Sequence, residues 1–298
     1  MSPPCDAWLD RLANLRKDAS RGVAPHKPLL LLVVLDLFET GKISGGQFCR
    51  DGELAFRFNA YWALGAPGRR SRPEVMLPFF HTRSDGFWTP CETDGRVAEA
   101  RELARIARLD PGFLDCLGND TFRRAAREKI IGTHFHGETR SALADFVGIP
   151  TPEGAAPPGT GEGKGQDTSA SSRRDARFAF QVLPAYNFTC ALTGYRMVAE
   201  DGTTVLDAAH IQRFRSGGPN VVQNGLALSK TAHWLFDRGI WSVDERYHVL
   251  VKSRAFEEAG EEALRIKTRD GTRIVLPQRE DSWPAQEFLA WHRQEHRF

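Results

Sequence analysis

Apolar residues recur with a helical period through much of the chain. In residues 7–17, Trp8, Leu12 and Leu15 fall on one face, which predicts an amphipathic helix. In residues 24–42 the apolar positions lie all round instead, which predicts a central helix buried in a core. Further helical patterns cover residues 52–64, 95–143, 175–186, 230–237 and 284–296.

A second pattern predicts short strands within the first half of the chain. Residues 75–81 and 87–89 are rich in apolar and aromatic residues, and they flank a turn that contains Asp85 and Gly86. An Asp-Gly pair between two such runs is a strong signal for a β-hairpin. We therefore expect a small β-hairpin in an otherwise helical region.

A low-complexity segment divides the chain. Residues 151–172 are rich in Pro, Gly, Ser and Thr and contain no aromatic or large aliphatic residue. Such a segment cannot bury enough surface to offset the cost of ordering it, so we interpret it as a flexible linker. The expected domains are residues 1–150 and 173–298, and helices followed by a small mixed domain predict an α+β protein.

Composition limits the classes of function. The chain has 298 residues, of which 41% are hydrophobic and 26% charged, and its net charge is +2, so any contact with nucleic acid must come from local basic patches. The longest apolar run, residues 29–35, falls short of the ~20 residues that cross a bilayer. Five unpatterned cysteines argue against a secreted disulfide scaffold. We expect a cytoplasmic protein with no membrane contact.

The side chains best suited to catalysis or metal binding lie within residues 203–240. A strand pattern over 205–210 is followed by a loop rich in Gly, Ser and Pro at 213–220. A returning strand is expected at 226–228 and a helix at 230–237. Two strands and a helix would therefore lie together here.

Five side chains in this stretch suggest hydrolysis of a phosphodiester bond. His233 and Asp237 are four residues apart on the expected helix, so they share a face and form a plausible half-site for a divalent metal. Histidine is the side chain most often used as a general base near neutral pH, so His210 is the candidate for that role, and Asn224 could hold the loop and orient His210. Asp207 is three residues before His210 and faces the other side of an ideal strand.

The order His210, Asn224, His233 resembles the HNH nucleases. The surrounding words are CALTGY at 190–195, DAAHI at 207–211, NGLAL at 224–228 and HWLFDRG at 233–239. The resemblance implies a ββα-metal domain in which His210 is the general base, Asn224 fixes the loop and His233 binds metal, with Asp237 as a second helix ligand. Many relatives carry a ligand directly before the base; here that residue is Ala209, and Asp207 is the candidate replacement.

The same resemblance bears on the metal ions. It implies Mg²⁺, Mn²⁺ or Ni²⁺ as the cofactor. Many relatives also hold a structural zinc with two Cys-x-x-Cys pairs, whereas this stretch contains only Cys190, so no structural zinc is expected.

The first domain contains basic residues interleaved with apolar ones, which suits contact with DNA. The phrases APHKPLLLL at 24–32 and RPEVMLPFFHTRSDGFW at 72–88 resemble the sulfur-binding domain of phosphorothioate-dependent restriction enzymes. The resemblance implies that Pro78 lines a small apolar pocket, with His26 and Lys27 beside it. Leu77 and His81 depart from the family pattern, so a different DNA modification, or none, stays open. The candidate DNA-binding residues are His26, Lys27, Arg69, Arg70, Arg72, Leu77, Pro78, Phe79, His81 and Arg83.

These observations favour a metal-dependent DNA endonuclease of a restriction system, which would recognise modified double-stranded DNA with its first domain and cut it with its second. One alternative is a sensor of DNA modification with weak or no cleavage. Another is a toxin-like, non-specific nuclease whose first domain binds a protein. Because each chain carries one site and a duplex has two strands, we expect a homodimer or sequential nicking.

Overall fold

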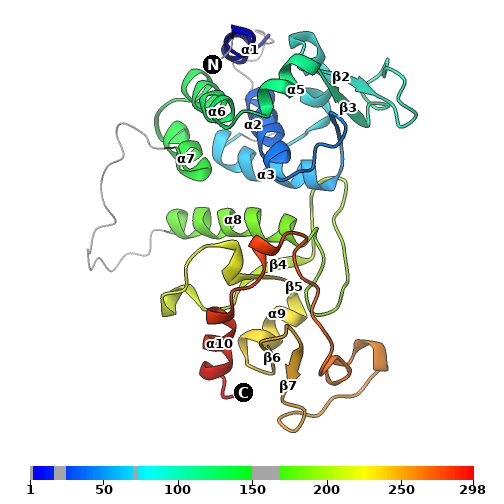
Figure 1. Ribbon diagram of the computed structural model, residues 1–298, viewed down its shortest axis with the longest axis vertical. Helices are drawn as coiled ribbons and strands as arrows, with labels where there is room; N and C mark the ends of the chain where they lie inside the picture. Colours follow the sequence, from blue (N-terminus) through cyan, green and yellow to red (C-terminus); the bar gives the residue numbers. More distant parts are fainter. Residues whose placement is uncertain (1–2, 17–24, 70–72, 150–167) are drawn as a thin grey trace. The chain divides into compact units, whose positions relative to one another are not determined.

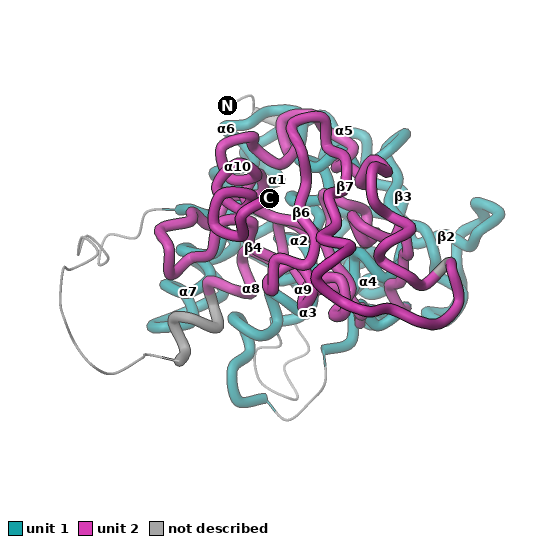
Figure 2. The backbone as a smooth tube through the Cα atoms, turned by 90° about the horizontal axis from the view of Figure 1, so that it is seen from below, with its two compact units in different colours: residues 1–162, 200–202 teal, residues 163–199, 203–298 magenta. Residues whose placement is uncertain are grey.

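The computed structural model describes residues 3–16, 25–69, 73–149 and 168–298 (Figure 1). The chain divides into two compact units, shown in different colours in Figure 2. Unit 1 comprises Met1–Glu162 with Glu200–Gly202, and unit 2 comprises Gly163–Ala199 with Thr203–Phe298. Among the described residues, none of the helices is both long enough and apolar enough to span a membrane.

Unit 1 is built around a buried helix, α2, as the apolar pattern predicts. Every residue from Pro28 to Leu37 of this helix is buried, and α3, α4 and α6 pack against it. Pro28 lies in the first turn, where a missing N–H costs nothing. The helices of the unit are α1 (Pro3–Ala13), α2 (His26–Glu39), α3 (Gly52–Gly65), α4 (Met76–His81), α5 (Pro111–Leu117), α6 (Asp120–His134) and α7 (Gly137–Val147).

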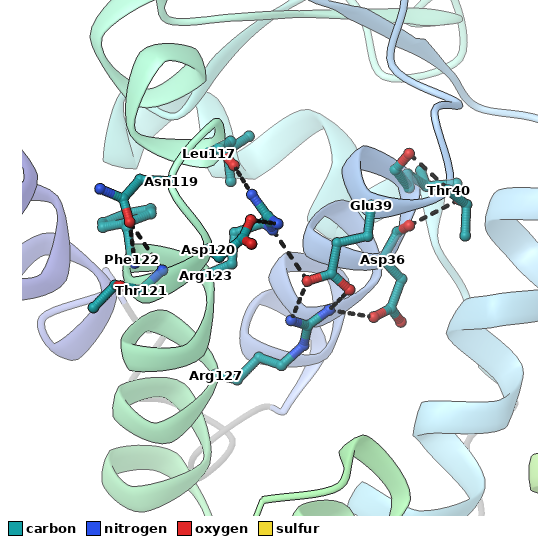
Figure 3. A network of polar contacts seen from close by, with 11 residues as sticks. Asp36, Glu39, Thr40, Leu117, Asn119, Asp120, Thr121, Phe122, Arg123 and Arg127 are labelled. Atoms are coloured by element: carbon teal, nitrogen blue, oxygen red, sulfur yellow. Dashed lines mark hydrogen bonds and ion pairs between the residues drawn. The ribbon is translucent and has the colours of Figure 1, made fainter.

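Buried charges link α2 to α6 (Figure 3). The guanidinium of Arg127 lies 2.8 Å from Oδ1 of Asp36 and 2.7 Å from Oε2 of Glu39. Arg123 also binds Glu39, and the hydroxyl of Tyr61 donates to Asp36 at 2.6 Å. Burial raises the pKa of Asp36, while the positive charge of Arg127 opposes that rise. The network satisfies polar groups that would otherwise be costly inside a helical core.

The hairpin expected at residues 75–89 is wrong. Residues 76–81 form α4, Thr82–Asp85 forms a 3₁₀ helix, and only then does a strand begin. The carboxylate of Glu74 accepts hydrogen bonds from the N–H groups of Met76 and Leu77, which caps the helix. Gly86, with φ of 78°, ends the turn that follows. The Asp-Gly pair therefore marks a helix end and not a two-residue hairpin.

A small antiparallel sheet does form in unit 1, in the order β1-β3-β2. Its middle strand was expected to be helical. The chain turns into α5 directly after this strand, because Asp110 caps the N–H groups of Gly112 and Phe113 and Pro111 occupies the first helical turn. The strands are β1 (Gln47–Cys49), β2 (Trp88–Cys91) and β3 (Ile106–Leu109).

One disulfide joins two helices of unit 1. Cys5 of α1 is bonded to Cys116 of α5, across 111 residues of sequence. No spacing of the five cysteines predicts this pairing, because the two residues meet only through tertiary packing. The remaining three cysteines, Cys49, Cys91 and Cys190, are free.

Unit 2 places a two-stranded antiparallel ribbon between two helices, as Figure 1 shows for β4, β5, α8 and α9. The expected strands at 205–210 and 226–228 and the expected helix at 230–237 are all present. A second ribbon and a final helix complete the unit. The elements are α8 (Thr168–Ala185), β4 (Leu206–His210), β5 (Gly225–Ser229), α9 (Lys230–Asp237), β6 (Trp241–Val243), β7 (Val249–Val251) and α10 (Gln286–Glu295).

The α+β class expected from the sequence is confirmed. Most of the expected linker, residues 151–167, lies outside the described residues. Its last five residues, 168–172, belong to α8, which therefore begins seven residues earlier than the pattern at 175–186 predicts. The domain boundaries at 150 and 173 stay a prediction.

Candidate active site on the β4–β5 ribbon and α9

The alternation of side chains along the β4–β5 ribbon decides which side each polar residue faces. β4 and β5 pair without interruption, from Leu206 opposite Ser229 to His210 opposite Gly225. Because successive residues of a strand face opposite sides, Asp207 and His210 point away from each other. His210 stacks on Phe178 of α8, whereas Asp207 contacts α9. No bulge brings the two side chains together.

Asn224 fixes the loop between the strands. Its side chain is fully buried, and its Oδ1 accepts a hydrogen bond from the N–H of Gln212 at 2.8 Å. Its Nδ2 donates to the carbonyl oxygens of Gln212 and Pro219, both at 2.9 Å. The loop is so tight that a Cβ on Gly218 would lie 1.9 Å from the oxygen of Gln212. Asn224 therefore acts on the backbone of the loop and makes no hydrogen bond to His210 in the described structure.

A different asparagine orients His210. The Nε2 of His210 lies 2.7 Å from Oδ1 of Asn220, and its ring stacks on Phe178 with centroids 3.8 Å apart. α8 can approach this closely because Gly225 has no side chain: a Cβ there would lie 2.4 Å from a methyl carbon of Val182. Since the amide oxygen accepts from Nε2–H, the Nδ1 of the neutral ring is left as a proton acceptor. Asn220 and Phe178 were not among the expected site residues.

Two carboxylates flank the imidazole of His233. The Nδ1 lies 3.4 Å from Oδ2 of Asp207, and the Nε2 lies 3.6 Å from Oδ2 of Asp237. The other oxygen of Asp207 accepts from Lys230 at 2.8 Å. The three expected metal-binding residues therefore lie together, but the two carboxylates approach opposite nitrogens of the His233 ring.

The donor set suits a divalent cation. An imidazole nitrogen with one or two carboxylates is a common ligand combination for Mn²⁺, Mg²⁺ and related ions. Within the described part of the chain, no three His, Cys, Asp or Glu side chains are arranged around a single point to hold a metal ion. His233 with Asp237 forms the half-site that fits best, because the two residues share one face of α9.

The loop after His210 returns to α9. The guanidinium of Arg213 donates a hydrogen bond to the main-chain oxygen of Asp237. This contact joins the end of β4 to the end of α9 that carries the carboxylate. It also brings the positive charge of Arg213 to the end of α9 that carries Asp237, where it would favour a bound phosphate. Arg213, too, was not predicted from the sequence.

Among the expected DNA-binding residues of unit 1, the apolar ones are mostly in the core. Pro78 and Phe79 are buried, and Phe79 packs edge-on against Phe48. The helical turn of α4 directs these side chains inward, whereas a strand would have alternated them. Leu77 remains 37% exposed.

The basic candidates of unit 1 have diverse surroundings. Lys27 is tied to Asp85 at 2.7 Å. Burial, with the charge of Arg69, holds the pKa of His26 below its ordinary value, so its ring is neutral at neutral pH. Burial and the charge of Lys27 likewise lower the pKa of His81, which is exposed. Arg70 and Arg72 lie outside the described residues.

A surface pocket of about 540 Å³ collects arginines in unit 1. Arg11, Arg16 and Arg83 line it, and only Arg83 was expected. None of the three forms an ion pair within the described residues, whereas Asp85 at the pocket is neutralised by Lys27. The N–H of Arg16 donates to Asp85 at 2.7 Å, which holds this edge in place. Asp10 also lines the pocket, so three arginine charges stand against the carboxylate of Asp10, and the lining keeps a net positive charge that suits an anion.

Comparison with known proteins identifies the class of unit 2. Residues 190–244 match the family described as HNH endonuclease, a range that includes the ribbon and α9. No curated protein matches the chain. A solved structure titled "Modification dependent TagI restriction endonuclease" is similar at a TM-score of 0.32 and 21% identity. The match covers 44% of this chain, and the chain spans only 44% of the length of that structure. The second unit carries an HNH endonuclease domain.

Proposed function

We propose that the chain is a metal-dependent DNA endonuclease of restriction type. Unit 1 would recognise modified double-stranded DNA, and the HNH domain would hydrolyse its phosphodiester bonds in the cytoplasm. The observation that carries the proposal is the orientation of His210. Asn220 holds its Nε2 at 2.7 Å, so Nδ1 is the free basic atom of the ring.

His210 acts as the general base in this proposal. Its Nδ1 takes a proton from a water molecule, and the water oxygen forms a bond to phosphorus as the bond to the 3′ oxygen breaks. The leaving 3′ oxygen takes up a proton from solvent, so the products carry a 5′-phosphate and a 3′-hydroxyl. Phe178, stacked on the ring, and Asn220 prevent it from rotating away from the attacking water. Arg213 adds a positive charge that favours the negative phosphate.

His233 and Asp237 would hold the divalent metal, with Asp207 as the third protein ligand. The metal, Mg²⁺, Mn²⁺ or Ni²⁺, supplies positive charge for the phosphate and the leaving oxygen when it is bound. Asp207 pairs with Lys230 and lies at the other nitrogen of the His233 ring, so it would join this metal only after exchanging that partner and after the ring or its own side chain reorients. Because each chain contributes one such site, cutting both strands requires a homodimer or two sequential nicks.

The arginine-lined pocket supports a DNA-reading role for unit 1. Arg11, Arg16 and Arg83 present donors to a phosphate oxygen, and contacts of this kind position DNA without reading its sequence. Recognition of a modification, phosphorothioate among the candidates, requires a further apolar or polar contact beside them. Leu77 is the exposed apolar residue among those expected for that contact.

The decisive experiment compares matched duplexes that are phosphorothioated, methylated or unmodified. Each is incubated with the protein and Mg²⁺ or Mn²⁺, and the products are resolved on a denaturing gel. We expect cleavage of one modified duplex and little of the unmodified one. Equal cleavage of all three duplexes would contradict modification dependence, and no cleavage of any would contradict the endonuclease.

A binding-only sensor is the second candidate, and one observation favours it. The residue before His210 is Ala209, which is fully buried and has no ligand atom, so the protein ligands of a metal are fewer than in many relatives. A sensor would bind modified DNA but would show no nicking when Mg²⁺, Mn²⁺ or Ni²⁺ is titrated in. Metal-stimulated nicking that is lost in His210→Ala would exclude it.

A further inference from the structure

The solvent face of α9 carries an exposed tryptophan beside the metal half-site. Trp234 is 57% exposed, whereas Ala232 and Phe236 on the opposite face of the same helix are buried. Large aromatic side chains contribute strongly to interfaces, because they offer a large apolar surface together with a polar edge. Trp234 follows His233 directly, so its surface lies next to the candidate catalytic residues.

Two cations lie in line with this tryptophan. Lys230, Trp234 and Arg238 are spaced four residues apart, so they form one stripe along α9. The guanidinium of Arg238 lies over the indole ring, 5.0 Å from its centroid. The side chain of Lys230 is 74% exposed. Lys230 pairs with Asp207 at 2.8 Å, so the stripe combines an aromatic face with the charge of Arg238 at one end and a partly neutralised charge at the other.

The stripe runs beside the metal half-site. His233 and Asp237 occupy the adjoining row of the same helix, displaced by one residue from Trp234 and Arg238. Lys230 and Arg238 are about 12 Å apart along the helix axis, at about 1.5 Å per residue. A DNA strand whose scissile phosphate lies at His233 and Asp237 would pass the stripe with its neighbouring phosphates within reach of these cations.

We propose that Trp234 and Arg238 hold the DNA duplex beside the scissile phosphate. The indole of Trp234 packs against the sugar and base edge of a neighbouring nucleotide, and Arg238 contacts the adjoining phosphate. This assignment rests on the proposed endonuclease function. It adds a substrate-binding surface that none of the general-base or metal-binding residues supplies.

The charge of the stripe argues for nucleic acid over a protein partner. Within the described residues, Arg238 forms no ion pair, so its charge is available to a polyanion. An exposed aromatic ring flanked by Lys and Arg combines stacking with phosphate contacts, a pattern that nucleic-acid-binding surfaces use. The position next to His233 along α9 places the stripe where DNA bound at the candidate site would pass.

The test uses the full chain and a cleavable duplex. Binding is measured in a His210→Ala background to prevent cutting, and kcat and KM are measured in the wild-type background. Trp234→Ala should raise Kd and KM by about 5- to 100-fold, the range for losing one aromatic–nucleotide contact, while kcat at saturating DNA stays near wild type. Arg238→Ala should reduce the slope of log Kd against log salt by about one.

Tyr195→Ala is the matched control, because Tyr195 is also 57% exposed in unit 2 and lies outside α9. It should leave Kd and KM unchanged. A wild-type Kd for Trp234→Ala would overturn the inference, as would a loss of self-association in sedimentation without a change in Kd, which would assign the stripe to a subunit interface. Wild-type cleavage is measured first, so failure of the nuclease function itself is seen separately.

Discussion

The Nε2 of His210 lies 2.7 Å from the Oδ1 of Asn220, ten residues further along the loop. This hydrogen bond selects the ring tautomer that is protonated at Nε2, so Nδ1 is free to accept a proton. The stack on Phe178 holds the ring in its plane. Asn224, by contrast, spends all its side-chain hydrogen bonds on the loop backbone.

Asn220→Ala should therefore lower kcat by about 10- to 100-fold, the usual cost of losing a partner that orients a reactive histidine. The reason is loss of the tautomer and not loss of folding, since Asn220 is only half-buried in its loop. Cleavage kinetics at saturating DNA measure the effect. The ¹⁵N shifts of the His210 ring should change from the Nε2–H pattern to a tautomer mixture.

Asn224→Ala is the contrasting variant. It removes three hydrogen bonds from a fully buried site, so it should lower the free energy of unfolding by about 2–4 kcal/mol. If Asn224→Ala were as stable as wild type, or if Asn220→Ala changed stability and not the ring tautomer, the division of roles between the two asparagines would be wrong.

Sequence reasoning succeeded where local signals suffice. The ribbon and α9 follow from short alternating and helical patterns, and the order of His210, Asn224 and His233 led to the HNH domain that the family comparison supports. The prediction for residues 75–89 failed because the Asp-Gly pair favoured a hairpin, whereas the cap from Glu74 stabilises a helix.

The site residues that the sequence did not predict were missed for one common reason. Packing of a loop and of α8 brings three residues to the site: Asn220, Phe178 and Arg213. Their spacing in the sequence does not predict these contacts. The same holds for the bond between Cys5 and Cys116, which depends on how α1 meets α5. Non-local contacts of this kind form only when the chain has folded.

The metal half-site makes a prediction about metal dependence. Asp237→Asn should raise the concentration of Mn²⁺ that gives half-maximal cleavage by about 10-fold or more, because a neutral amide is a weaker ligand than a carboxylate. Titration of cleavage with Mn²⁺ measures the shift. Asp207→Asn tests the third ligand in the same assay, and an unchanged titration would show that Asp207 serves only to hold Lys230 and His233.

The charge network of Figure 3 makes a prediction about unit 1. Arg127→Ala leaves Asp36 buried without its ion-pair partner, so the free energy of unfolding should fall by about 3–5 kcal/mol. Urea unfolding, followed by a probe in unit 1, measures the change. Arg124 lies on the exposed side of the same helix, α6. Arg124→Ala should therefore leave the free energy of unfolding unchanged. Equal effects of the two variants would contradict a structural role for the network.

His292 makes unit 2 sensitive to acid. Burial, with the charge of His296 second, lowers the pKa of His292 from 6.5 to about 3. Above pH 6.5 the ring is neutral in both states, so its contribution to stability is fully present. As the pH falls from 6.5 towards 3, the unfolded chain binds a proton that the folded chain does not, and stability is lost.

Thermal unfolding at about pH 7.5 and about pH 5 measures this loss. Because pH 5 lies ~1.5 units below the pKa of the unfolded histidine, the free energy of unfolding should fall by about 2 kcal/mol. His292→Gln cannot titrate, and its amide retains donors and acceptors for Ser242 and the carbonyl of Phe236. The variant should therefore lose less stability between the two pH values than wild type. The same loss in both proteins would assign the acid sensitivity to other groups.

The central claim is that His210 is the general base of a DNA-cleaving HNH domain. Single-turnover cleavage of a modified duplex by wild type and by His210→Ala, with Mg²⁺ or Mn²⁺ present, tests it most directly. We predict that wild type cuts the duplex and that His210→Ala binds it with the same affinity but cuts it at least about 100-fold more slowly. Cleavage by His210→Ala at the wild-type rate would contradict the account.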